Sequence, residues 1–261
     1  IDSVFALDSG GAIYVSPYAY NVTFVDVKVR SSTAEQLYGG AFFVGENCIG
    51  MHFIDTHVIN SVAGDHGGGI YVDGDVTDLT ISNCVFVNNR AGYTVEGGNG
   101  GAVFALGSLN GVEISNTFFT SNAVAGRGGA AYINAAVDVV FQNVSFADNT
   151  AGEGGGALLL NSSEVKMRSC EFANNYISAC EGCVMRLSTT NTFGGAIYAV
   201  QNNKIGMTSS EIRHSANASF GGALHAESTN TITMEKTSLL KGKSTFGGGF
   251  SANVSNIFEL T

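Results

Sequence analysis

The chain has 261 residues, of which 44% are hydrophobic and 13% are charged, and its formal net charge is −10. The apolar content argues against intrinsic disorder, and the negative charge argues against nucleic acid or anionic lipid as partners. The 35 glycines do not fall at every third position, which excludes collagen, and no run of 18 apolar residues predicts a membrane-spanning helix.

A Gly-Gly pair recurs along the whole chain and divides it into repeats. The first pair opens the segment Gly10–Ile13, and successive pairs begin 26 to 39 residues apart. The later pairs begin at Gly39, Gly67, Gly100, Gly128, Gly155, Gly194, Gly221 and Gly247. Such a period indicates a repeat protein in which each unit contacts only its neighbours. We expect residues 1–261 to form a single domain that is a fragment of a longer surface protein.

Each repeat contains three stretches with the pattern of a short strand. The first follows the glycines, as in Ile13–Val15, and the second starts about a dozen residues later, as in Val22–Phe24. The third is anchored by one apolar residue, such as Phe119, and a turn-forming residue such as Asn122 follows three positions later. Apolar residues two apart are typical of a strand with one buried face.

One repeat cannot bury its apolar face alone. Ordering a residue costs about 1–2 kcal/mol of backbone entropy, and a buried Val, Leu or Phe returns roughly 1.5–3 kcal/mol. Stacked repeats bury a continuous core and pair every strand with its counterparts, about 4.8 Å away. The sequence therefore predicts an all-β, right-handed, single-stranded parallel β-helix of about nine coils with three short strands each. Stacking would also align Asn89, Asn122, Asn149 and Asn175 in an amide ladder.

Five cysteines give an odd count, and only Cys180 and Cys183 lie close in sequence. Both fall in an insertion near 177–192, and a second insertion spans 93–99. We favour a disulfide between Cys180 and Cys183 over two free thiols, since partners for a zinc site are missing. Cys84 and Cys170 hold the same place three coils apart, roughly 14 Å, which is too far for a disulfide.

A file of aromatic residues occupies the outward position of the first strand in most repeats. These residues are Tyr14, Phe43, Tyr71, Phe104, Tyr132 and Tyr198. One interpretation is an exposed stripe that binds a protein, a second copy of the chain, or sugar rings. The other is cross-strand stacking that only stabilises the sheet.

Other clusters give weaker signals. Asp73, Asp75 and Asp78 suggest either a calcium site or a solvated acidic turn, and no other metal or cofactor is expected. Asp26 and Asp55 are equivalent in two coils, but Asn83 and Asn116 continue the series, which favours a polar turn ladder over a catalytic pair. We therefore expect no catalytic residues. Sequons for N-glycosylation lean towards a secreted protein, and they begin at Asn21, Asn143, Asn161, Asn217 and Asn253.

Two motifs in register carry a family resemblance. Gly-Gly-Ala followed by Ile, Leu or Val is complete at five sites, for example Gly100–Val103, and Phe-x-x-Asn occurs at four, for example Phe119–Asn122. The pair resembles the repeats of the chlamydial polymorphic outer membrane proteins, and similar repeats are common in protist surface proteins. The resemblance implies a β-helical autotransporter passenger domain that acts in adhesion at the cell surface.

Two functional hypotheses follow. The first is an extracellular or cell-surface β-helix with a structural or adhesive role, as in a fibre. Its partners would be a surface protein or glycan of a host or neighbouring cell, or other copies of the fibre. The alternative is a secreted polysaccharide-degrading β-helix, a lyase or glycoside hydrolase, which would need carboxylates gathered on adjacent coils.

Overall fold

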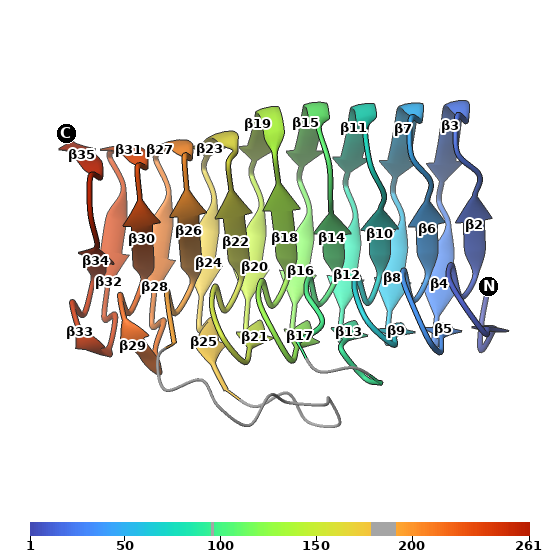
Figure 1. Ribbon diagram of the computed structural model, residues 1–261, viewed down its shortest axis with the longest axis horizontal. Coiled ribbons are helices and arrows are strands. Elements are labelled where there is room, and N and C mark those ends of the chain that lie inside the picture. The colour runs from blue at the N-terminus through green and yellow to red at the C-terminus, as the bar shows by residue number, and fades with distance from the viewer. Residues whose placement is uncertain (95–96, 179–191) are drawn as a thin grey trace.

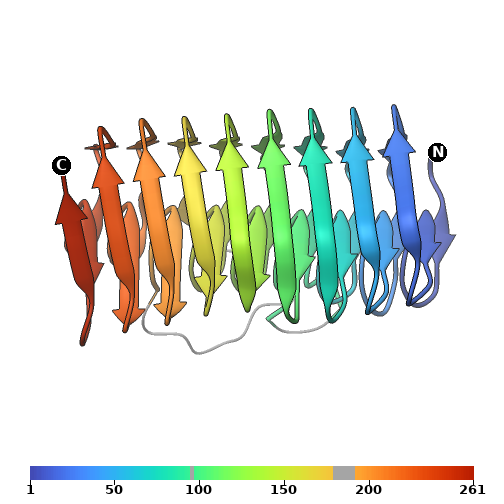
Figure 2. The ribbon, with the colours of Figure 1, turned by 90° about the horizontal axis from the view of Figure 1, so that it is seen from above.

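The computed structural model describes residues 1–94, 97–178 and 192–261 as a rod of stacked coils. The amino and carboxyl ends lie at opposite ends of the rod (Figure 1). The strands of one sheet lie side by side across the long axis of the rod and all point in the same direction, as Figure 2 shows from above. The described residues contain no helix, and thus none that could span a membrane.

Each coil contributes one strand to each of several parallel sheets, whose order follows the chain. Sheet I contains β2 (Ile13–Val15), β6 (Phe42–Val44), β10 (Ile70–Val72), β14 (Val103–Ala105), β18 (Ala131–Asn134), β22 (Leu158–Asn161), β26 (Ile197–Gln201), β30 (Leu224–Ser228) and β34 (Phe250–Ala252). Sheet II contains β3 (Tyr20–Val25), β7 (Ile49–Ile54), β11 (Val76–Ser82), β15 (Leu109–Ser115), β19 (Ala136–Gln142), β23 (Glu164–Arg168), β27 (Lys204–Thr208), β31 (Thr231–Glu235) and β35 (Ile257–Leu260). Sheet III contains β4 (Lys28–Arg30), β8 (His57–Ile59), β12 (Val85–Val87), β16 (Phe118–Thr120), β20 (Ser145–Ala147), β24 (Glu171–Ala173), β28 (Glu211–Arg213) and β32 (Ser238–Leu240).

A fourth strand position, absent from the sequence prediction, completes the coil. Sheet IV contains β1 (Phe5–Ala6), β5 (Thr33–Ala34), β9 (Val62–Ala63), β13 (Arg90–Ala91), β17 (Ala123–Val124), β21 (Thr150–Ala151) and β25 (Tyr176–Ile177). The pair β29 (Ala218–Phe220) and β33 (Ser244–Phe246) follows it towards the carboxyl end. Most of these strands have only two residues, which is too short for an alternating pattern to be recognised in the sequence.

Equivalent residues of successive coils lie directly beside one another, as predicted. Phe119 pairs with Phe86 on one side and Phe146 on the other, and Phe146 pairs with Phe172. Their rings stack inside the rod with centroids 4.9, 5.1 and 4.6 Å apart. These four phenylalanines are fully buried. They belong to one hydrophobic core that extends through the coils.

The glycine pair makes the tight corner before sheet I. Gly100, the first of its pair, has a φ of +65°, a left-handed conformation that glycine adopts without steric cost. A Cβ on Gly101, the second, would lie 2.0 Å from the carbonyl oxygen of Gly129 in the next coil. Both conditions recur along the rod, so backbone geometry explains why the pair is repeated.

The predicted asparagine ladder is present and fully buried. The side-chain amide of Asn122 donates to Asn149 Oδ1 at 3.0 Å, and its own Oδ1 accepts from Asn89 Nδ2 at 3.0 Å. Asn149 continues the ladder to Asn175. A second ladder, which the sequence analysis missed, lies at the turn between sheets I and II. It contains Asn203, Asn230 and Asn256.

Candidate functional site

The aromatic file of sheet I is stacked as predicted, but most of it is covered. Tyr14 is 55% exposed, whereas Phe43, Tyr71, Phe104 and Tyr198 are buried. The half-buried Tyr132 packs at the edge of the same cluster. The six residues therefore do not form a continuous exposed stripe, and Tyr14 alone among them is largely exposed.

The covering side chains come from the residue just before several of the Gly-Gly pairs. The Tyr38 ring stacks on Tyr71 with centroids 4.3 Å apart, and the His66 ring stacks on Phe104 at 4.5 Å. Phe193 similarly stacks on Tyr198 at 5.2 Å. A second layer of rings thus lies outside sheet I. The position before the glycines holds several residue types, so the repeat pattern that predicts the strands does not predict this layer.

His225 continues the file and is fully buried among these rings. Its Nδ1 lies 2.7 Å from Ser251 Oγ, and its Nε2 is buried without a hydrogen-bond partner. Burial lowers the pKa of His225 from 6.5 to about 4, although the nearby Glu227 carboxylate acts in the opposite direction. The imidazole is therefore neutral at physiological pH.

Acid is expected to destabilise this part of the rod. Between pH 6.5 and 4 the unfolded chain binds a proton on His225 that the folded chain does not, so stability falls as pH falls through this window. The full shift corresponds to about 3 kcal/mol. His225→Phe should lose this pH-dependent part of the folding free energy. Its denaturant midpoint should therefore change less between pH 7 and pH 4 than that of the wild type. An equal change in both proteins would contradict this account.

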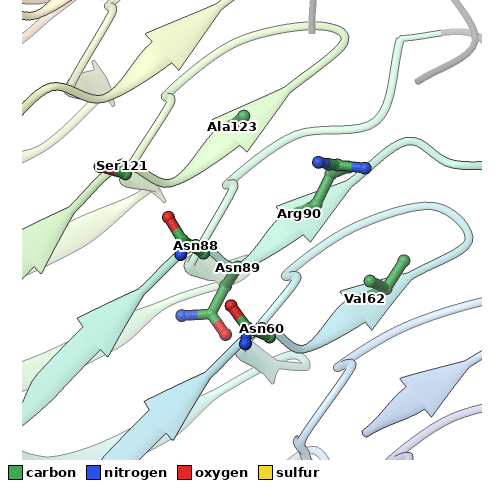
Figure 3. A pocket seen from close by; sticks show the side chains of 7 residues that line it. All are labelled: Asn60, Val62, Asn88, Asn89, Arg90, Ser121 and Ala123. Atoms are coloured by element: carbon green, nitrogen blue, oxygen red, sulfur yellow. The ribbon is translucent and has the colours of Figure 1, made fainter. Parts of the chain in front are cut away.

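A groove runs along the corner between sheets III and IV, where Figure 3 shows two parallel files of side chains. Asn60, Asn88 and Ser121 form the turn file, and Val62, Arg90 and Ala123 form the strand file. The hollow has a volume of about 330 Å³, and the buried Asn89 of the amide ladder lines it.

The turn file presents polar side chains to solvent because its backbone is left-handed. The φ angles of Asn60, Asn88 and Ser121 are +54°, +53° and +56°. Their backbone N–H groups donate to carbonyls of the next coil, for example Asn88 N to Thr120 O at 3.1 Å. Within the described part of the chain, no hydrogen bond or ion pair holds these side chains or the Arg90 guanidinium. Two amides, a hydroxyl and a cation are thus free to bind one ligand.

The repeat pattern of the sequence does not reveal this groove. Position-by-position alignment would have shown polar residues one place before the ladder asparagines, but nothing in the sequence showed that a fourth strand follows. Without sheet IV the corner between sheets III and IV cannot be predicted, and neither can the position of the Arg90 side chain beside it.

Comparison with known proteins fits this architecture. A family model for the right-handed β-helix region matches residues 53–258. The chain belongs to this family. No curated protein and no solved structure matches the chain. Family membership confirms the right-handed β-helix predicted from the crossover rule.

The acidic turn of this β-helix does not assemble into a metal site. Asp75 Oδ1 accepts a hydrogen bond from the backbone N of Ser108 at 3.0 Å. Among the residues that the structure describes, no group of three or more His, Cys, Asp or Glu side chains could hold a metal ion. The calcium hypothesis for Asp73, Asp75 and Asp78 therefore has no support in the geometry.

The series of equivalent residues that begins with Asp26 and Asp55 lies at a turn that recurs in successive coils. Both have a left-handed backbone, with φ of +50° and +51°, and Asn116 and Asn143 repeat it two and three coils further on. The side-chain amide of Asn143 donates to Asn116 Oδ1 at 2.9 Å. This agrees with the expected polar turn ladder.

Three cysteines of the β-helix, Cys48, Cys84 and Cys170, are buried free thiols. Burial raises the pKa of Cys84 and of Cys170 to about 11, which keeps both protonated and poorly reactive. Cys180 and Cys183 lie outside the described residues, as does most of the longer insertion. Their proposed disulfide stays a prediction.

The sequons of the β-helix differ in accessibility. Asn21, Asn143, Asn217 and Asn253 are exposed, as a glycosylation acceptor must be. Asn161 is partly buried, and its amide donates to Asn134 Oδ1 at 2.7 Å. The accessible acceptors are therefore the four exposed asparagines.

Proposed function

We propose that this right-handed β-helix is an extracellular or cell-surface structural protein that adheres to a glycan through the groove between sheets III and IV. The observation that carries the proposal is the set of free polar groups on Asn60, Asn88, Ser121 and Arg90, aligned on successive coils. Amides and hydroxyls at regular spacing complement the hydroxyls of a sugar chain lying along the rod. A groove of about 330 Å³ is large enough for a small ligand.

Arg90 gives the groove a preference for acidic sugars. The chain as a whole carries a formal net charge of −10, and Arg90 places a positive charge among the polar side chains of this groove. Within the described residues, no carboxylate forms an ion pair with it. A guanidinium binds a carboxylate through two parallel hydrogen bonds. The Gly-Gly-Ala and Phe-x-x-Asn motifs, which resemble those of the chlamydial polymorphic outer membrane proteins, support a surface location, as do the exposed sequons.

The groove can be tested by removing its polar groups without disturbing its turns. Asn60→Gly and Asn88→Gly delete the amides while keeping the left-handed backbone, because glycine adopts positive φ freely. Combined with Arg90→Gln, they should weaken binding to an immobilised panel of neutral and acidic glycans at least tenfold. Arg168→Gln is the matched control, since Arg168 is an exposed arginine on sheet II, away from the groove.

The outcomes separate the functional classes. Glycan binding that depends on the groove residues, with no release of reducing ends or unsaturated sugars, supports the proposal. Turnover of the glycan would replace it with the polysaccharide-degrading alternative. Binding that is equal in the groove variant and in the Arg168 control would show that the ligand lies elsewhere.

A further inference from the structure

A second hollow lies outside sheet I, near the amino end of the rod. It has a volume of about 350 Å³ and receives side chains from successive coils. Tyr14 and Phe43 come from the middle of β2 and β6, and Tyr38 comes from the turn before Gly39. Asp8 and Asp73 add one carboxylate each, after β1 and β10 respectively.

The aromatic rings of this hollow are fixed in place by stacking. The Tyr14 and Phe43 rings are nearly parallel, at 5°, with centroids 4.7 Å apart, and Phe43 stacks in turn on Tyr71 at 5.5 Å. Tyr38 lies against Tyr71 at 4.3 Å. Tyr14, at the open end of this stack, is 55% exposed. A ligand therefore meets a ring surface that is already ordered.

The carboxylates of the hollow lack a cation of their own. Within the described residues, no Lys, Arg or His forms an ion pair with Asp8 or Asp73. The negative charge of Asp73 reaches the rings, because it adds to burial in raising the pKa of Tyr71 and adds to burial and to Asp65 in raising that of Tyr38. The faces of aromatic rings are also the negative part of their quadrupole. The two carboxylates and the open face of Tyr14 thus make the hollow electronegative.

We propose that this hollow binds an organic cation, an alkylated ammonium group, beside the exposed Tyr14 ring and the carboxylates of Asp8 and Asp73. Aromatic faces with nearby negative charge attract such cations strongly. A bare metal ion fits less well, because the described residues provide no group of three metal-ligating side chains here. The site is distinct from the groove between sheets III and IV and does not depend on the function proposed for that groove.

Choline and its uncharged isostere 3,3-dimethyl-1-butanol test the proposal with two probes of the same shape. Isothermal titration of the whole chain should show saturable binding of choline and at least tenfold weaker binding of the alcohol. Choline binding should also weaken as salt is added, because partly exposed charges are screened. Equal affinity for the two probes, or no saturable binding of choline, would overturn the proposal.

Substitutions in the hollow test whether choline binds there. The double variant Asp8→Asn with Asp73→Asn keeps the shape and should weaken choline binding at least tenfold. Tyr14→Leu should weaken it as well, whereas Tyr20→Leu should leave it unchanged, since Tyr20 is an exposed tyrosine of the same coil outside the hollow. Circular dichroism confirms that each variant is folded. Choline binding that survives the double substitution would refute the site. So would a wild-type protein that fails to bind choline but binds a methyl glucoside as tightly as the double variant does.

Discussion

Gly101→Ala is expected to destabilise the protein by about 4 kcal/mol or more, among the largest effects of a single substitution. The new Cβ would lie 2.0 Å from the carbonyl oxygen of Gly129 and 2.8 Å from the backbone N and O of Ala123. All three atoms belong to backbone that is hydrogen-bonded between coils, so no side-chain rotation can relieve the overlap. The coils would have to separate at this corner, which would break their hydrogen bonds.

The matched control is Gly206→Ala. Gly206 lies in β27 on the outer face of sheet II, and a Cβ there would meet nothing within 4 Å. Because alanine restricts the unfolded chain more than glycine does, this variant should be neutral or slightly more stable than the wild type. Urea unfolding followed by circular dichroism measures both variants. Similar midpoints for the two would show that contact between glycines does not set the spacing of the coils.

The periodic features of the fold were predictable because each is repeated along the chain. One Phe-x-x-Asn segment predicts little, but four segments in register place Phe119 in a stack and Asn122 in a ladder, and both are present. In a solenoid, a position in one coil determines its neighbours in the coils on either side. The register therefore follows from the alignment of the repeats, without any long-range contact being known.

Features made by a single residue or a short strand could not be predicted in this way. The outward direction of Tyr71 was predicted correctly, but its burial depends on Tyr38 from the preceding coil, whose position in the repeat holds dissimilar residues. The groove likewise depends on two-residue strands such as β13 (Arg90–Ala91). The alternation of apolar and polar residues predicts whether a side chain points into or out of the rod. Its exposure depends on which side chains of a neighbouring coil cover it.

Repeated positions determine the stability of this protein, whereas positions that differ between coils form its proposed binding sites. The inward and ladder positions repeat with similar residues, so they carry the fold. The groove and the hollow depend on residues such as Arg90 and Asp73, whose positions hold other residue types in the neighbouring coils. Substitutions in these two places should therefore change ligand binding with little effect on the rod, which is the property the binding experiments rely on.

Asn122→Ala is expected to destabilise the rod by about 3–5 kcal/mol, since several buried groups would lose their partners together. The amide of Asn122 donates to Phe86 O and to Asn149 Oδ1, both at 3.0 Å. Its Oδ1 accepts from the backbone N and from Nδ2 of Asn89, also at 3.0 Å. Alanine would leave the Phe86 carbonyl and the Asn89 backbone N–H buried without these hydrogen bonds, and a cavity the size of the amide would remain.

Two further variants distinguish the ladder from simple loss of volume. Asn122→Asp keeps the shape but places an oxygen against the acceptors Phe86 O and Asn149 Oδ1, so at neutral pH it should be at least as destabilising as alanine. Asn110→Ala, at an exposed position of the same coil, should change stability by less than about 0.5 kcal/mol. Urea midpoints provide the comparison. If Asn122→Asp were as stable as the wild type, the donated hydrogen bonds would not hold the coils together, and packing of the phenylalanine stack would have to account for their cohesion.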